Sequence, residues 1–142
     1  MSKKLYIDTN VIIDMIQNRD NEYGRNIGKY ASYLFSESRK CKFYVVISDW
    51  TIKESYKYLD PTELRLFIQL LKKKIIKQKY DNLDKKKAKN LSSKNFTDAL
   101  HVILAEKSNS DMIITSNIKD FIELDSKIPI KKPKEIKNSS LF

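Results

Sequence analysis

Cysteine, glycine, proline and histidine are all scarce in this sequence. Its 142 residues include one cysteine, two glycines, three prolines and one histidine. The lone cysteine, Cys41, excludes an internal disulfide, so the fold does not depend on an oxidising compartment. So few glycines and prolines argue against an all-β fold with many turns and favour long helices with short connections. Without a histidine pair or a cysteine cluster, a zinc site is disfavoured.

Long apolar runs are missing as well. No stretch approaches the roughly 20 residues that are needed to cross a bilayer, and no signal peptide precedes the first strand-like segment. We therefore expect a cytoplasmic protein with no membrane partner. The length and an apolar fraction of 41% suit one compact domain over residues 1–142. We expect residues 131–142 to form a flexible basic tail.

The charge is strongly of one sign. Formal net charge is +10 and the pI is near 9.5, which favours a polyanionic partner such as nucleic acid. A solvated, lysine-rich surface is the alternative. The same choice applies to the basic stretch Lys72–Asn90, which is interpreted either as a phosphate-binding arm or as a solvated helix end and loop.

The hydrophobic pattern predicts strands alternating with helices. Strands are expected at 5–7, 43–47, 112–115 and, at a sheet edge that tolerates Pro129, 128–130. Helices are expected at 11–17, 24–38, 49–59, 97–107 and 118–124, with another beginning at Thr62. This alternation predicts an α/β fold, a three-layer α/β/α sandwich with a central parallel sheet.

Acidic and amide side chains follow the predicted strands. Asp8 ends the first strand, Glu54 lies in the helix after strand 43–47, and Asp98 lies in the first turn of helix 97–107. Asn117 and Asp120 follow strand 112–115. In parallel α/β sheets the strand ends and the starts of the following helices share one edge, where ligands bind. We therefore expect these residues to converge.

Converging carboxylates repel one another and are costly to bury unless a cation compensates them. Mg²⁺ or Mn²⁺, as one or two ions, suits oxygen ligands of this kind. Such an ion activates water for phosphodiester hydrolysis and stabilises the leaving oxygen. A 2′-hydroxyl nucleophile would instead need a base, and His101 is the only histidine available. We favour metal-activated water and interpret His101 as an ordinary helix residue.

Each acid also has a purely structural interpretation. Asp8 could cap a helix together with Asn10, and Asp98 could simply complement the helix dipole. Glu54 could be a surface residue and Asn117 a cap. Three further acids are interpreted as surface or capping residues: Asp14, Asp49 and Asp111.

Four ordered segments resemble the successive motifs of PIN domains. They are YIDTNVIIDMI at 6–16, ISDWTIKESYKYL at 47–59, FTDALHVILAEK at 96–107 and DMIITSNIKDFIEL at 111–124. They are most similar to the single-domain VapC-type toxin ribonucleases. The resemblance extends from Lys4 to about Leu124.

The resemblance implies a parallel sheet of about five strands and cleavage of RNA that depends on Mg²⁺ or Mn²⁺. It implies catalytic roles for Asp8, Glu54, Asp98 and Asp120, with Asn117 as a further metal ligand at a position where the family often has Asp. Supporting polar positions match Thr9, Asn10, Thr115 and Ser116. The family further implies a homodimer and an antitoxin partner. Apart from the resemblance, four lysines are candidates for RNA phosphate contacts: Lys53, Lys57, Lys94 and Lys119.

Two other classes compete with a ribonuclease. A non-catalytic RNA-binding or scaffold module would bind RNA in a salt-sensitive manner without cleaving it. A phosphoacceptor receiver domain would need an acceptor aspartate at the end of strand 43–47, where the sequence has Ser48. The three acids Asp8, Glu54 and Asp98 speak against the first class, and Ser48 against the second.

Overall fold

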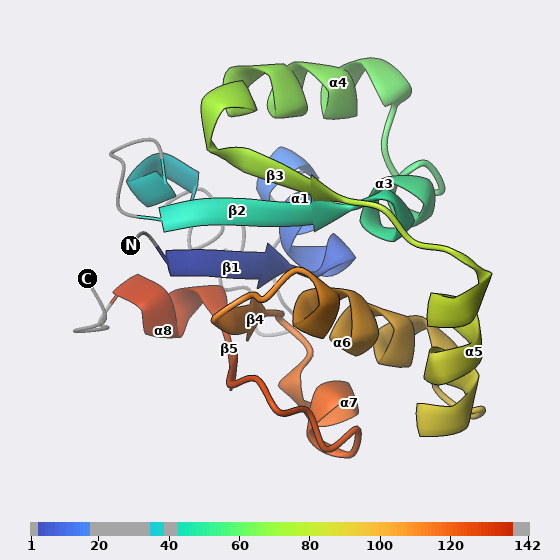
Figure 1. Ribbon diagram of the computed structural model, residues 1–142. Coiled ribbons are helices and arrows are strands. Elements are labelled where there is room, and N and C mark those ends of the chain that lie inside the picture. The colour runs from blue at the N-terminus through green and yellow to red at the C-terminus, as the bar shows by residue number, and fades with distance from the viewer. Residues whose placement is uncertain (1–2, 18–34, 39–42, 138–142) are drawn as a thin grey trace.

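The computed structural model describes residues 3–17, 35–38 and 43–137, and places five parallel strands at its centre. The strands are β1 (Lys3–Ile7), β2 (Phe43–Ser48), β3 (Ile75–Gln78), β4 (Met112–Ile114) and β5 (Ile130–Lys131). Their order across the sheet is β3-β2-β1-β4-β5, and each neighbouring pair is parallel. The predicted α/β/α fold with a five-stranded parallel sheet is confirmed (Figure 1).

Alternate strand residues face opposite sides of the sheet, as the two-residue period of a strand requires. Leu5 and Ile7 pack with α1 (Thr9–Gln17), α4 (Pro61–Leu70) and Ile136 of α8 (Pro133–Lys137). Tyr6, between them, packs on the other face with α5 (Asn82–Leu91), α6 (Phe96–Lys107) and Phe121 of α7 (Ile118–Ile122). The sheet is therefore buried on both faces, which explains its continuous apolar strands.

Three helices begin at polar caps that the sequence supplies. Ser48 accepts a hydrogen bond from the Thr51 backbone at the start of α3 (Asp49–Ser55). Asp60 caps α4, whose first residue is Pro61, and proline is favoured there because its missing N–H needs no partner. Asp81 and Asp84 form a reciprocal capping box at the start of α5. These caps fix where the three helices begin.

The basic stretch at 72–90 contains regular structure that the sequence did not predict. A 3₁₀ turn, η1 (Lys72–Lys74), leads into strand β3, and α5 follows. Neither the arm nor the loop included a strand. Among the strands that the structure describes, β3 pairs with β2 alone, and such an edge strand needs few apolar residues because Lys77 can point to solvent.

Other boundaries shift by a few residues. α1 begins at Thr9 rather than Val11, and α3 ends at Ser55 rather than near Leu59. In the last segment the strand is β5, at 130–131. Within the expected tail, 133–137 form α8; residues 138–142, like most of the expected helix 24–38, lie outside the described residues. Over the residues that the structure describes, no helix is long and apolar enough to span a membrane.

Candidate active site

Asp8 lies at the carboxyl end of the central strand and is almost completely buried. Its Oδ1 accepts a hydrogen bond of 2.8 Å from the Thr9 backbone N–H. Its Oδ2 accepts one of 2.8 Å from the Thr115 hydroxyl. Burial raises the pKa of Asp8 and the charge of Glu54 adds to the rise, although His101 and the two hydrogen bonds oppose it. The two hydrogen bonds therefore hold the carboxylate in one orientation. Its burial makes the ionised form unfavourable.

Glu54 reaches the same edge from α3. Its Oε1 accepts hydrogen bonds from the Thr9 hydroxyl at 2.8 Å and from His101 Nε2 at 2.7 Å. Burial works to raise the pKa of Glu54, but His101, Thr9 and the charge of Lys57 outweigh it and lower the pKa. Glu54 is consequently the acid of this edge whose ionised form the surrounding residues stabilise.

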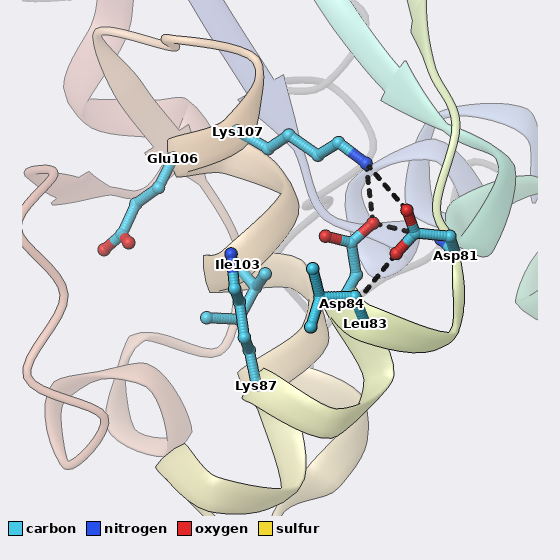
Figure 2. A pocket seen from close by; sticks show the side chains of 7 residues that line it. All are labelled: Asp81, Leu83, Asp84, Lys87, Ile103, Glu106 and Lys107. Atoms are coloured by element: carbon cyan, nitrogen blue, oxygen red, sulfur yellow. Dashed lines mark hydrogen bonds and ion pairs between the residues drawn. The ribbon is translucent and has the colours of Figure 1, made fainter.

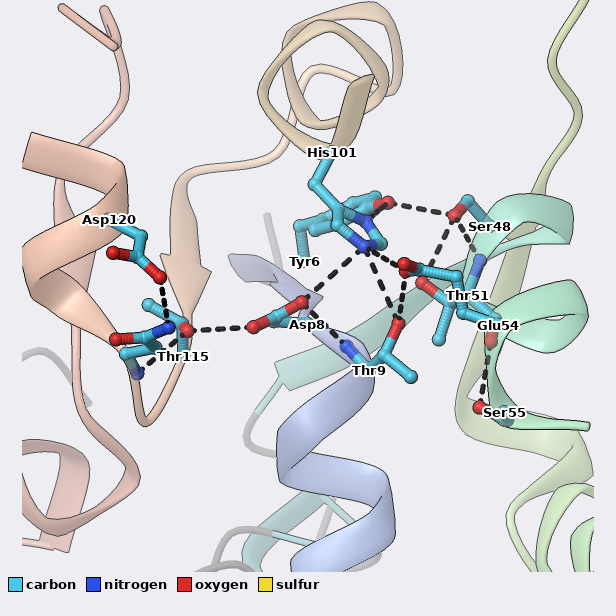
Figure 3. A network of polar contacts seen from close by, with 11 residues as sticks. Tyr6, Asp8, Thr9, Ser48, Thr51, Glu54, Ser55, His101, Thr115 and Asp120 are labelled. Atoms are coloured by element: carbon cyan, nitrogen blue, oxygen red, sulfur yellow. Dashed lines mark hydrogen bonds and ion pairs between the residues drawn. The ribbon is translucent and has the colours of Figure 1, made fainter. Parts of the chain in front are cut away.

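His101, expected to be an ordinary helix residue, lies inside this group of acids (Figure 3). Its side chain is 1% exposed, and Nε2 is also 3.4 Å from Asp8 Oδ1. Nδ1 lies 2.7 Å from the Tyr6 hydroxyl, which in turn lies 2.7 Å from the Ser48 hydroxyl. Burial lowers the pKa of His101, but Tyr6, Glu54 and Asp8 together raise it well above its ordinary value. The ring therefore bridges the two acids, whose charges favour its protonated form.

Asp98 lies in the first turn of α6. Burial raises its pKa to about 6, and the charges of Asp8 and Asp120 contribute to the rise, while His101 and a hydrogen bond with Asn95 oppose it. Asp98 therefore faces Asp8 and Asp120 closely enough for their charges to repel. Asp120 is exposed and accepts a hydrogen bond from the Asn117 amide.

The predicted supporting residues divide between two tasks. Thr9 and Thr115 orient Asp8, and the Thr115 hydroxyl also accepts from the Asn117 backbone N–H at 3.0 Å. Ser116 turns to Asp14 instead, donating to its Oδ2 at 3.0 Å. Asp14 was interpreted as a surface or capping acid, which is wrong because it is 1% exposed. Asn10 is half-buried in the first turn of α1.

The candidate lysines differ in their distance from the acids. Lys57 is close enough to Glu54 for its charge to lower the pKa of that acid. Lys53 lies over the Trp50 ring, 5.6 Å from its centroid. Lys94 and Lys119 are exposed. Of these four lysines, Lys57 is therefore the one placed near the acids by its electrostatic interaction with Glu54.

The residues at this edge suit a hard divalent cation in donor type and charge. Burial raises the pKa of Asp98, and the charges of Asp8 and Asp120 add to the rise; a dication would offset negative charge placed in this way. As they stand, no three His, Cys, Asp or Glu side chains among the described residues form a ready-made ligand set. His101 already contacts Glu54, whereas the pKa of Asp98 is raised by burial and by its acidic neighbours, so a cation would offset the most negative charge toward Asp98 and Asp120.

A second charged hollow lies between α5 and α6, and its volume is about 300 Å³. Lys107 Nζ lies 2.7 Å from Asp84 Oδ2 and 3.9 Å from Asp81 Oδ2 (Figure 2). Asp84 is buried and also belongs to the capping box of α5. The ion pairs of Lys107 with Asp84 and Asp81 connect α6 to the start of α5, which gives this hollow a structural role that differs from the edge around Asp8.

The sequence was compared with models of known protein families. A family model described as PIN domain matches residues 4–119. The chain belongs to the PIN domain family. The match includes Asp8, Glu54, Asp98 and Asn117, and ends one residue before Asp120. No curated protein matches the chain in sequence.

Solved structures share the PIN fold at low sequence identity. VapBC2 from Rickettsia felis, bound to a DNA fragment from its promoter, is 14% identical with a TM-score of 0.62, over 91% of this chain and 98% of that one. VapBC-1 from nontypeable Haemophilus influenzae is 16% identical with a TM-score of 0.59, over 92% and 98%. Mycobacterium tuberculosis VapC20, a sarcin-ricin loop cleaving toxin, is 12% identical with a TM-score of 0.57, over 77% and 86%.

Proposed function

We propose that this PIN domain protein is an endoribonuclease that hydrolyses RNA phosphodiester bonds with Mg²⁺ or Mn²⁺. The observation that carries the proposal is the convergence of acids at the carboxyl edge of the sheet: His101 contacts both Asp8 and Glu54 there, and burial together with the charges of Asp8 and Asp120 raises the pKa of Asp98. We propose Asp8, Glu54, Asp98 and Asp120 as the catalytic acids, and the same four with Asn117 as the groups that hold the ion.

When bound, the ion would supply an activated water and stabilise charge on the phosphate and the leaving oxygen. The side chains of this chain supply orientation. Thr9 and Thr115 fix the two oxygens of Asp8. Glu54 receives both of its hydrogen bonds at Oε1, so among the described contacts Oε2 is the oxygen left for a ligand. Asn117 aligns Asp120 at the open side of the site.

The basic character of the chain supports RNA as the substrate. A net charge of +10 raises the local concentration of a polyanion, and Lys57 stands beside Glu54. We propose Lys53 and Lys57 for phosphate contacts nearest the acids, and Lys94 and Lys119 farther out. VapC20, which shares the fold, is a toxin that cleaves RNA at the sarcin-ricin loop.

We also propose that the chain is the toxin of a toxin–antitoxin pair and forms a homodimer in the cytoplasm. The structures of VapBC2 and VapBC-1 share its fold over almost their whole length. Exposed apolar side chains also support protein partners. On α4, Leu66 and Leu70 are 61% and 65% exposed, and Tyr58 before it is 62% exposed. Leu66 and Leu70 are four residues apart and therefore share one face of α4, and exposed apolar patches mark interaction surfaces.

Cleavage of mixed RNA by the purified protein tests the proposal. With Mn²⁺ we expect cleavage that EDTA abolishes and that Asp8→Asn lowers at least about 100-fold, the effect of removing a charge-stabilising group. Asp111→Asn is the matched control, because Asp111 accepts from the Lys4 backbone at the start of β4, at the opposite edge of the sheet. Cleavage that survives EDTA or Asp8→Asn would refute the metal mechanism. RNA binding without any cleavage would instead favour the non-catalytic module.

A further inference from the structure

His101 is placed as a support for one particular acid. It lies on α6, one turn after Asp98, and its ring crosses the sheet edge to Glu54 of α3 (Figure 3). The bond from Nε2 to Glu54 Oε1 is 2.7 Å, while the approach to Asp8 Oδ1 is 3.4 Å. The ring therefore holds Glu54 directly and Asp8 only loosely.

The other ring nitrogen is fixed from the strands. Nδ1 lies 2.7 Å from the hydroxyl of Tyr6, a fully buried residue of β1. That hydroxyl lies 2.7 Å from Ser48 at the end of β2, and Ser48 accepts from the Thr51 backbone at the start of α3. The chain of contacts Ser48–Tyr6–His101–Glu54 thus ties two central strands to two helices. With both nitrogens engaged, the ring has one orientation.

We propose that His101 is a positioning residue: through Nε2 it holds Glu54 beside Asp8, and Tyr6 and Ser48 align its ring for this purpose. The proposal rests on the proposed function for its catalytic readout. A ring that is 1% exposed cannot itself meet RNA, so His101 acts through Glu54. Groups that orient a metal-binding carboxylate typically change metal affinity or activity by 10- to 100-fold when removed, to order of magnitude.

Two amide substitutions separate positioning from simple packing. His101→Gln can place a donor near the position of Nε2 and keep the contact with Glu54, whereas His101→Asn can replace only Nδ1 and keep the contact with Tyr6. Both side chains are neutral and polar, and burying either one costs a similar free energy. The two substitutions should therefore lower the Tm, measured by thermal unfolding, by similar amounts. Packing alone predicts that both variants lose function equally.

The test has two measurements: RNA cleavage, and Mn²⁺ binding in the absence of RNA by isothermal titration calorimetry. We expect His101→Asn to lower kcat at least about tenfold with an unchanged KM for RNA and to weaken Mn²⁺ binding at least about tenfold. His101→Gln should recover most of both losses. Tyr6→Phe, which removes only the aligning hydroxyl, should lower kcat and Mn²⁺ affinity in the same direction but less, and it decides the question if the amide variants do not fold.

Equal losses in the Asn and Gln variants, or Mn²⁺ affinities unaltered in all three, would overturn the positioning role. The calorimetric result stands apart from catalysis. If the wild-type protein cleaves no RNA while Mn²⁺ affinity still separates the Asn and Gln variants, the ribonuclease proposal fails and His101 remains the support of the metal site.

Discussion

At the scale of single residues, Asp8, Glu54 and Asp98 are compensated unequally. Glu54 has the His101 ring and the Thr9 hydroxyl as partners, and Asp8 has two hydrogen bonds. Asp98 has Asn95 but faces Asp8 and Asp120, and its pKa is raised to about 6. Burial and these neighbouring charges therefore make ionisation of Asp98 unfavourable in the absence of a cation.

This difference predicts how stability depends on pH without metal. The pKa of Asp98 rises from 3.8 when unfolded to about 6 when folded, so its stabilising effect is complete below pH 4 and is lost as pH rises through 6. Asp98→Asn mimics the protonated acid. In EDTA at pH 7 we expect this variant to be more stable than wild type by about 1 kcal/mol, a value reduced for partial solvent exposure.

The two proteins should converge toward pH 4, and saturating Mn²⁺ should reverse their order at pH 7. Urea unfolding at several pH values measures this. If wild type and Asp98→Asn keep a constant difference from pH 4 to pH 7 in EDTA, the charge of Asp98 is already compensated by the protein.

At the scale of elements, α5 shows how a lysine-rich segment becomes a packed helix. Its capping box and the ion pair between Lys107 and Asp84 fasten it to α6. Asp81→Ala removes the acceptor for the Asp84 backbone N–H, and we expect the Tm to fall by roughly 3–5 °C. Asp81→Asn keeps a capping oxygen and should lose less than half as much. Equal Tm values for the Ala and Asn variants would show that the cap does not limit the stability of α5.

What the sequence predicted well depends on local patterns. Asp8 and Glu54 were predictable because each follows an apolar strand, and parallel strands end at one edge. β3 was not predictable from Ile75 and Ile76 alone, since an edge strand beside β2 needs little apolar sequence. His101 and Tyr6 carry no local pattern that marks them as partners; they meet only because α6 crosses the end of β1. Asp14 was misjudged because the loop that buries it, at Ser116, is distant in sequence.

At the scale of the whole molecule, the positive charge predicts salt-sensitive binding. The test uses the Asp8→Asn protein, so that the RNA stays intact, and measures its affinity for RNA by fluorescence anisotropy. About four phosphate contacts on single-stranded RNA give a slope of about −2.8 in log K against log salt, a loss of roughly 50-fold between about 50 and 200 mM. Adding Lys53→Gln and Lys57→Gln together should make this slope shallower by about 1.4.

Lys134→Gln in α8, at the far end of the molecule from α3 (Figure 1), is the control and should leave the slope unaltered. An affinity that does not vary with salt would contradict an electrostatic interface. A slope lowered equally by Lys134→Gln would show that charge acts diffusely over the whole surface.

The central position of β1 has a consequence for synthesis. Asp8, near the start of the chain, obtains its hydrogen bond from Thr115, 107 residues later, and β1 needs β4 on one side as well as β2 on the other. A ribosome releases these parts in order, so a growing polypeptide exposes Asp8 long before its last partner exists. Fragments that end before β4, whether from interrupted translation or a premature stop codon, therefore lack the Thr115 partner of Asp8, and the site is assembled only after β4 has been synthesised.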